Sequence, residues 1–114
     1  PFYSDGRRLK IILSNIISNS IKYADLSKEQ SIVSLSIRNN TDGCNIMIRD
    51  NGIGIEPKYI QNIYDMFFRA TTNNEGDGLG LYIVKEIIDK LHGSITVDSI
   101  ITKGSTFKIQ LPSL

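Results

Sequence analysis

The fold is organised around one stretch, Asn45-Ile46-Met47-Ile48-Arg49-Asp50-Asn51-Gly52-Ile53-Gly54-Ile55. Apolar and polar residues alternate over its first half, which predicts a strand with one buried face. The strand leads into the carboxylate of Asp50 and then into two glycines, Gly52 and Gly54. Because glycine lets a backbone approach a ligand closely, the stretch indicates a nucleotide pocket. A first interpretation is that these two glycines hold phosphate, and the remainder of the chain tests it.

Composition restricts the classes of protein that this chain can represent. Its 114 residues are 40% hydrophobic, which predicts a single domain with a real core. The net charge of +1 is too balanced for a general binder of nucleic acid or membrane surfaces. One cysteine, Cys44, and one histidine, His92, exclude an internal disulfide and a cysteine- or histidine-based metal site. The sequence contains neither a signal peptide nor an apolar run of the roughly 18–20 residues that a membrane span needs.

The first predicted helix carries a polar stripe. Ser4 or Asp5 can cap it, and apolar residues at helical spacing extend it to about Tyr23. At about 100° per residue, Asn15, Asn19 and Lys22 fall within about one-sixth of the circumference. A solvated face is one explanation. A binding face is the other, because asparagine is a poor helix former that a solvated face does not need.

The rest of the chain predicts a two-layer α/β sandwich, with helices on one face of a mixed, mostly antiparallel sheet. The apolar alternation predicts four strands, and the glycine-, proline- and asparagine-containing segments predict the turns between them. A loop rich in Thr, Asn and Gly over Ala70–Asp77 is long enough to act as a lid. The predicted elements after the first helix are strands Ser31–Arg38 and Cys44–Arg49, a short helix Lys58–Met66, a helix Tyr82–Leu91, and strands Ser94–Ser99 and Ser105–Leu111.

The common phosphate-binding motifs are absent. No GxxxxGK[ST] is present, and neither Gly52-x-Gly54 nor Gly78-x-Gly80 continues as GxGxxG. However, Gly76, Gly78 and Gly80 open a helix, where free N–H groups and the helix dipole attract anions. A flexible hinge is the alternative explanation for these three glycines.

The polar stripe supplies partners for such an anion. Amide oxygens of Asn15 and Asn19 suit Mg²⁺, which binds jointly with phosphates, and Lys22 adds positive charge. Arg69 stands at the start of the lid, where a guanidinium could reach a terminal phosphate. His92 ends a helix, and its expected role there is structural.

The chain as a whole resembles the ATP-binding catalytic domain of sensor histidine kinases, which share the Bergerat-type fold of gyrase, heat-shock chaperone and mismatch-repair ATPases. Five motifs carry the resemblance in order along the whole chain, 1–114. They are Asn15-Ile16-Ile17-Ser18-Asn19-Ser20-Ile21-Lys22-Tyr23, Asp50-Asn51-Gly52-Ile53-Gly54-Ile55, Phe67-Phe68-Arg69, Gly76–Leu81 and Gly104-Ser105-Thr106-Phe107.

The resemblance implies a binding role for each matching residue. Asp50 would accept a hydrogen bond from the adenine amino group, and Thr106 would join it there through a water. Gly52 and Gly54 would leave room beside the base, which moves the phosphate role to Gly76–Leu81. Arg69 and Asn15 would serve transfer of the γ-phosphate, and Asn19 would ligate Mg²⁺. The complete expected set for ATP is Asn15, Asn19, Lys22, Tyr23, Asp50, Gly52, Gly54, Ile55, Phe68, Arg69, Gly78, Leu79, Gly80, Leu81 and Thr106.

The resemblance also implies partners. The γ-phosphate of ATP would pass to a histidine in a separate dimerisation domain, and a response regulator would act downstream. Nucleic acid is not an expected partner, and the chain itself is expected to be monomeric. It would be an N-terminally truncated, cytoplasmic piece of a kinase whose parent can be anchored in the inner or plasma membrane. The alternatives are a non-catalytic or regulatory ATP-binding module and a serine-kinase anti-sigma factor of the same superfamily.

Overall fold

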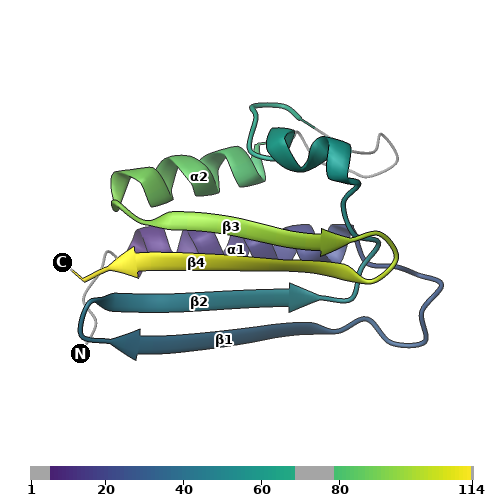
Figure 1. Cartoon of the computed structure of the whole chain (residues 1–114), viewed down its shortest axis with the longest axis horizontal. Coiled ribbons are helices and arrows are strands. Elements are labelled where there is room, and N and C mark those ends of the chain that lie inside the picture. Colours follow the sequence, from purple (N-terminus) through teal and green to yellow (C-terminus); the bar gives the residue numbers. More distant parts are fainter. Residues whose placement is uncertain (1–5, 69–78, 114) are drawn as a thin grey trace.

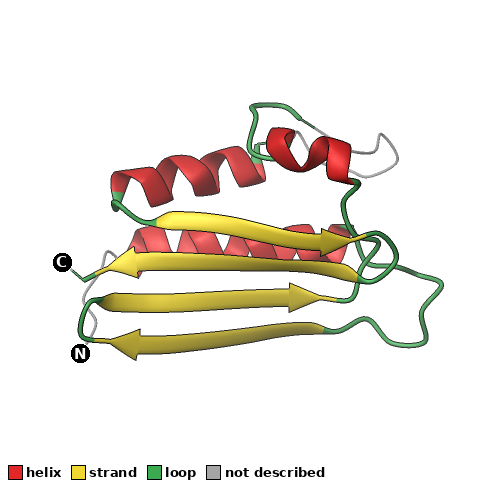
Figure 2. Ribbon diagram, in the orientation of Figure 1, coloured by secondary structure: helices red, strands yellow, loops and turns green. Residues whose placement is uncertain are grey.

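The computed structural model describes residues 6–68 and 79–113. Its strands form one sheet in the order β1-β2-β4-β3, and its two longer helices lie on one face of that sheet (Figures 1 and 2). The predicted two-layer α/β sandwich is therefore confirmed. The elements are α1 (Gly6–Lys22), β1 (Val33–Asn40), β2 (Gly43–Asp50), the 3-10 helix η1 (Pro57–Asn62), α2 (Gly80–Lys90), β3 (Ser94–Ile100) and β4 (Gly104–Pro112).

The sheet is antiparallel at every pairing between described strands, so the expected mixed character is wrong for this part of the chain. β1 pairs with β2, β2 with β4, and β3 with β4, each antiparallel. Hairpins explain two of the pairings, because the β1–β2 and β3–β4 connections are short turns. The crossing from β2 to β3 through α2 places β4 between them, which puts β2 and β4 at the centre.

The core lies between these two central strands and the helices. Alternation turns Ile46 and Ile48 of β2, and Phe107 and Ile109 of β4, toward the helical layer, and all four are at most 2% exposed. Ile12 and Ile16 of α1 and Val84 and Ile88 of α2 complete the cluster from the other side. Because helical residues four apart share a face, each helix buries one narrow apolar stripe.

Strand β1 is covered much less than its sequence suggests. Val33, Leu35 and Ile37 share the helix-facing side, because Leu35 pairs with Ile48 and Ile37 with Ile46. They nevertheless remain 39%, 47% and 50% exposed. The burial pattern of the whole strand is exposed, since no described helix reaches across this edge of the sheet.

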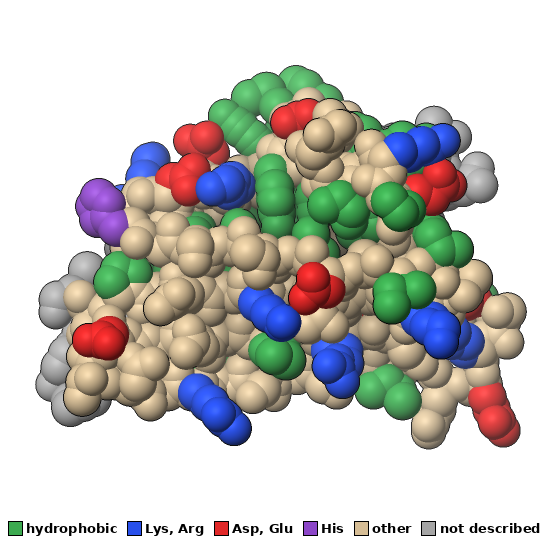
Figure 3. All heavy atoms as spheres, viewed as in Figure 1, with side chains coloured by type: hydrophobic (Ala, Val, Ile, Leu, Met, Phe, Trp, Pro, Cys, Tyr) green, Lys and Arg blue, Asp and Glu red, His purple; other side chains and the backbone are tan. Residues whose placement is uncertain are grey.

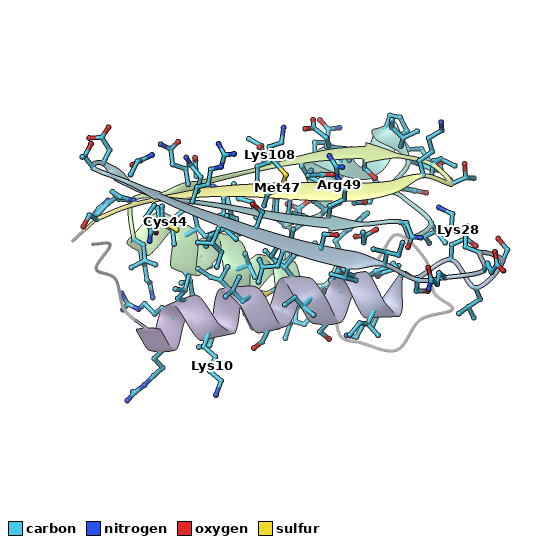
Figure 4. The ribbon with its side chains drawn as sticks, turned by 90° about the horizontal axis from the view of Figure 1, so that it is seen from below. Lys10, Lys28, Cys44, Met47, Arg49 and Lys108 are labelled. Carbon is cyan, nitrogen blue, oxygen red and sulfur yellow. The ribbon has the colours of Figure 1, made fainter. Side chains whose placement is uncertain are left out.

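The other face of the sheet is open and polar. Charged side chains of both signs are scattered over it (Figure 3). Figure 4 shows Met47, Arg49 and Lys108 on the side of the sheet opposite α1. Lys108 pairs with Asp98 at 3.2 Å, an exposed contact of the kind that contributes only ~0–1 kcal/mol to stability.

Two helix predictions need correction. The helix expected over Lys58–Met66 is instead the 3-10 helix η1 followed by turns, and Phe67 adopts a φ of 64° that no α-helix can contain. The helix expected from Tyr82 begins two residues earlier, at Gly80, and ends at Lys90.

His92 completes the end of α2 through its backbone. It adopts a left-handed φ of 62°, its N–H donates to the carbonyl of Asp89, and the N–H of Gly93 donates to that of Ile88. This arrangement satisfies carbonyls that the helix end would otherwise leave without partners. The structural role of His92 therefore comes from its left-handed backbone conformation and not from its side chain. Glycine would adopt this conformation with the least strain.

Replacing His92 with glycine should consequently stabilise the protein. We expect His92→Gly to raise the free energy of unfolding by about 1 kcal/mol, because the left-handed conformation costs an L-residue roughly that amount. Thermal and urea denaturation would measure it. Glu86→Gly is the control: Glu86 is an exposed residue inside the same helix, and its replacement should lose about 1 kcal/mol. A loss of similar size in both variants would contradict the assignment.

Candidate functional site

The carboxylate of Asp50 is held by three donors at the end of the central strand β2. Its Oδ1 accepts the N–H of Gly52 at 2.9 Å and the N–H of Ser105 at 3.2 Å. Its Oδ2 accepts the hydroxyl of Ser20 at 3.2 Å. The donors come from the loop after β2, from β4 and from α1, so this one group joins three elements. The side chain is fixed as a hydrogen-bond acceptor on the helical side of the sheet.

The two glycines after Asp50 have a packing reason. A Cβ on Gly52 would collide with the carbonyl oxygen of Tyr23. That oxygen accepts a hydrogen bond from the N–H of Ile53 at 3.0 Å. Gly54 has a φ of 77°, and a Cβ there would collide with the carbonyl oxygen of Ile100. The loop thus docks against the end of α1 on one side and the β3–β4 hairpin on the other. Whether the same glycines also border a base stays a prediction.

The loop is fastened at two further points. The N–H of Ile55 donates to Ser99 Oγ at 2.7 Å, and the N–H of Thr102 donates to the carbonyl of Ile53 at 2.8 Å. Ile55 and Phe68 both pack against the edge of the core, and the ring of Phe68 lies 5.7 Å from that of Tyr59. Both residues, which are expected to contact the nucleotide, therefore belong to the segment after Asp50 and pack against the core.

The polar stripe of α1 faces the beginning of α2. Asn15 and Asn19 are half-buried, and a Cβ on Gly80 would lie 3.6 Å from Asn15 Oδ1. Within residues 6–68 and 79–113 the two amide groups make no hydrogen bond, so they are available to a ligand. Lys22 is exposed at the end of the same stripe, and Tyr23 is half-buried beside it.

The start of α2 presents N–H groups beside this stripe. The first bond inside the helix runs from the N–H of Ile83 to the carbonyl of Leu79 at 2.9 Å. The N–H groups of Gly80, Leu81 and Tyr82 therefore have no carbonyl partner within the helix, and the helix dipole adds positive potential at this end. The remaining predicted contributors, Arg69 and Gly78, and the lid over Ala70–Asp77 lie outside the described residues.

Among the described residues expected at the site, Thr106 is the one that lies on the other face of the sheet from the Asp50 carboxylate. It pairs with Arg49 and so belongs to the open face, whereas Asp50 shares the face of Ile48 and Phe107. Its neighbour Ser105 is 6% exposed, donates its N–H to Asp50, and lies 2.8 Å from Ser99 Oγ. The period of two in β4 could have found Ser105, because it is in phase with the buried Phe107, Ile109 and Leu111.

Burial keeps two further ionisable side chains, those of Cys44 and Tyr64, neutral. Burial raises the pKa of the Cys44 thiol above its usual value, and burial raises the pKa of Tyr64 to about 12. Among the described residues, no group of three or more His, Cys, Asp or Glu side chains could hold a metal ion. No helix in the same ranges is long and apolar enough to cross a bilayer.

In the described part of the site, amide oxygens and a helix N-terminus without a carboxylate cluster fit a cation that arrives with phosphates. These groups do not fit a cation that the protein would hold without a ligand. An adenine-like base fits at the other end, where a fixed carboxylate can accept from an amino group.

Comparison with known proteins agrees with this arrangement. Residues 4–114 match the family model described as histidine kinase-, DNA gyrase B-, and HSP90-like ATPase. The chain belongs to this family. It corresponds to the ATPase domain of two-component sensor histidine kinases.

Two curated relatives illustrate the match. The probable C4-dicarboxylate sensor kinase of Bacillus subtilis (strain 168) is 37% identical over 113 residues, covering 98% of this chain and 21% of that protein. Sensor histidine kinase RcsC of Salmonella typhimurium is 37% identical over 112 residues, covering 95% of this chain and 11% of that protein. The chain therefore spans between about a tenth and a fifth of the length of these relatives.

Solved structures give the same family. The mycobacterial sensor histidine kinase MprB superposes with a TM-score of 0.81 at 27% identity, covering 98% of this chain and 76% of that one. Full-length ShkA in complex with AMPPNP superposes with a TM-score of 0.82 at 27% identity, covering 98% of this chain and 23% of that one.

If Gly54 is required for packing, substitution should unfold the loop irrespective of any ligand. We expect Gly54→Ala to lower the free energy of unfolding by about 2–3 kcal/mol, because it adds left-handed strain to a backbone collision. Denaturation without nucleotide would measure this. Gly6→Ala is the control, since a Cβ there meets nothing within 4 Å. An unchanged stability of Gly54→Ala would leave only a ligand-related reason for the glycine.

Proposed function

We propose that this chain binds ATP with Mg²⁺ and presents the γ-phosphate to a histidine in a separate dimerisation domain. A response regulator would then receive the phosphate. The observation that carries the proposal is the Asp50 carboxylate, oriented by three donors beside a stripe of asparagine and a helix N-terminus. The family match and the kinase relatives support the same conclusion.

Adenine would bind at the Asp50 end. A carboxylate held by Gly52, Ser105 and Ser20 can only accept at its remaining lone pairs, so it matches the amino group of adenine. Guanine presents a carbonyl oxygen at that position, which would face the carboxylate with acceptor against acceptor. In this proposal Ser105, whose N–H donates to Asp50, stands beside the base in place of Thr106, which the resemblance suggests.

The phosphates would bind between α1 and the start of α2. The N–H groups of Gly80 and Leu81 would donate to phosphate oxygens, as would Leu79 and Gly78 in the segment before them. Asn19 and Asn15 would direct amide oxygens to the metal, and Lys22 would supply charge. When bound, Mg²⁺ would neutralise part of the phosphate charge. Arg69 would contact the γ-phosphate at the moment of transfer.

Asp50→Asn should change which nucleotide binds. We expect the Kd for Mg-ATP to rise by about 10- to 100-fold, the range for losing a hydrogen bond to a buried charged group. An amide nitrogen in place of Oδ2 would meet the adenine amino group as donor against donor. A 6-oxo nucleotide such as inosine triphosphate should lose much less.

Isothermal titration calorimetry with both nucleotides would measure these affinities. Asp98→Asn is the matched control, because Asp98 is an exposed carboxylate on β3 that is paired with Lys108. Equal loss for both nucleotides, or an unchanged affinity for ATP, would contradict the proposed contact with the base.

The chain should bind ATP without phosphorylating itself. Its only histidine, His92, is constrained at the end of α2, at the opposite end of that helix from Gly80. Incubation with γ-labelled ATP should therefore leave no acid-labile phosphate on the protein, while the same sample binds a fluorescent ATP analogue. Label that appears on the chain and disappears in His92→Gly would overturn this expectation.

A further inference from the structure

Ser20 is a buried polar residue to which the proposed function gives no role beyond one of the three hydrogen bonds to Asp50. Its side chain lies on the apolar stripe of α1, one turn after Ile16, and is 3% exposed. Its hydroxyl lies 3.1 Å from the carbonyl oxygen of Ile16 and 3.2 Å from Asp50 Oδ2. A serine in this position either satisfies itself within its own helix or acts on the carboxylate.

The single proton of the hydroxyl has to choose between two acceptors. The carbonyl of Ile16 lies inside α1, where it already accepts the backbone N–H four residues later. Asp50 Oδ2 is the stronger acceptor, because a hydrogen bond to a charged group is stronger than one between neutral groups. If the proton pointed to Ile16, two oxygen atoms would face each other without a hydrogen between them.

The two oxygens of Asp50 consequently have different surroundings. Oδ1 accepts two backbone N–H groups, from Gly52 and Ser105. Oδ2 accepts only the hydroxyl of Ser20 among the described residues. A carboxylate oxygen has about two acceptor positions. Oδ2 is therefore the oxygen that can accept a further donor from a ligand.

We infer that Ser20 is a positioning residue for base recognition: its hydroxyl fixes Asp50 so that Oδ2 is presented to the amino group of the base. This inference rests on the proposed function. Rotation of the hydroxyl toward Ile16 would not create a donor at the base, because the proton would then point into α1. The pair of Ser20 and Asp50 thus offers acceptor character alone and selects a base that carries an amino group.

The test compares two nucleotides in the 114-residue chain. We expect Ser20→Ala to weaken Mg-ATP binding by about 5- to 10-fold, less than the loss of a direct hydrogen bond to a charged group, because Ser20 acts on the base only through Asp50. Purine riboside triphosphate lacks the amino group, and its affinity should change less than about twofold. Alanine is favoured in helices, so the variant should keep its fold. Ser18→Ala, an exposed serine on the same helix, is the control.

A double-mutant cycle with Asp50→Asn separates positioning from packing. If Ser20 acts through Asp50, the loss from Ser20→Ala should largely disappear in the Asp50→Asn background. An equal loss for both nucleotides, or a loss that persists in that background, would overturn the inference, as would no loss at all. Ser20→Cys retains size and a weak donor, and should give an intermediate affinity that decides the matter if the alanine variant is unstable.

Failure of the inference differs from failure of the proposed function. If the unmodified chain binds neither nucleotide, the proposed function itself is wrong. If it binds ATP and Ser20→Ala binds equally well, only the role of Ser20 is wrong.

Discussion

The Asp50 carboxylate is the constraint on which the surrounding arrangement depends. It lies at the end of a central strand. Its oxygens accept hydrogen bonds from the loop that follows, from the neighbouring strand β4 and from α1. A partly buried charge is costly unless donors surround it, so the three elements must meet at this point for the fold to tolerate the carboxylate. The three hydrogen bonds that orient Asp50 for its proposed contact with a base thus also hold the sheet against the first helix.

Close backbone approach is the second device that fixes this end of the sheet. The glycines at 52, 54 and 104 each lie against a carbonyl oxygen of another segment, belonging to Tyr23, Ile100 and Asp50 respectively. Any side chain at these positions would hold the segments apart. The proposed base end is therefore built of backbone and short side chains, which cannot easily shift. Such rigidity suits discrimination between bases that differ at one donor or acceptor, because a movable partner would adapt to either.

Much of this could be predicted from the sequence, and the remainder could not for identifiable reasons. Period-two alternation gave the strands, and helical spacing gave the stripe of Asn15 and Asn19. Motif position alone does not decide between Ser105 and Thr106, but the period of two in β4 does, because Ser105 is in phase with the buried Phe107. The 3-10 helix at Pro57–Asn62 was missed, because local apolar spacing does not reveal where a chain must turn back to the sheet. The exposure of Val33, Leu35 and Ile37 could not be predicted either. Alternation shows which residues share one face of a strand, but it does not show whether a helix covers that face.

The three sides of α1 explain why recognition and packing occur on the same helix. Ile12, Ile16 and Ser20 form its buried side, Asn15 and Asn19 turn toward α2, and a shallow apolar groove including Leu13 and Ile17 follows the third side. A helix anchored by two buried isoleucines can hold its polar stripe at a constant distance from the start of α2. Ser20 continues the buried stripe by one turn, to the level of Asp50, where an apolar residue would leave Oδ2 without a donor. The hydroxyl at a core position therefore marks the point at which the buried stripe of α1 ends and the proposed base site begins.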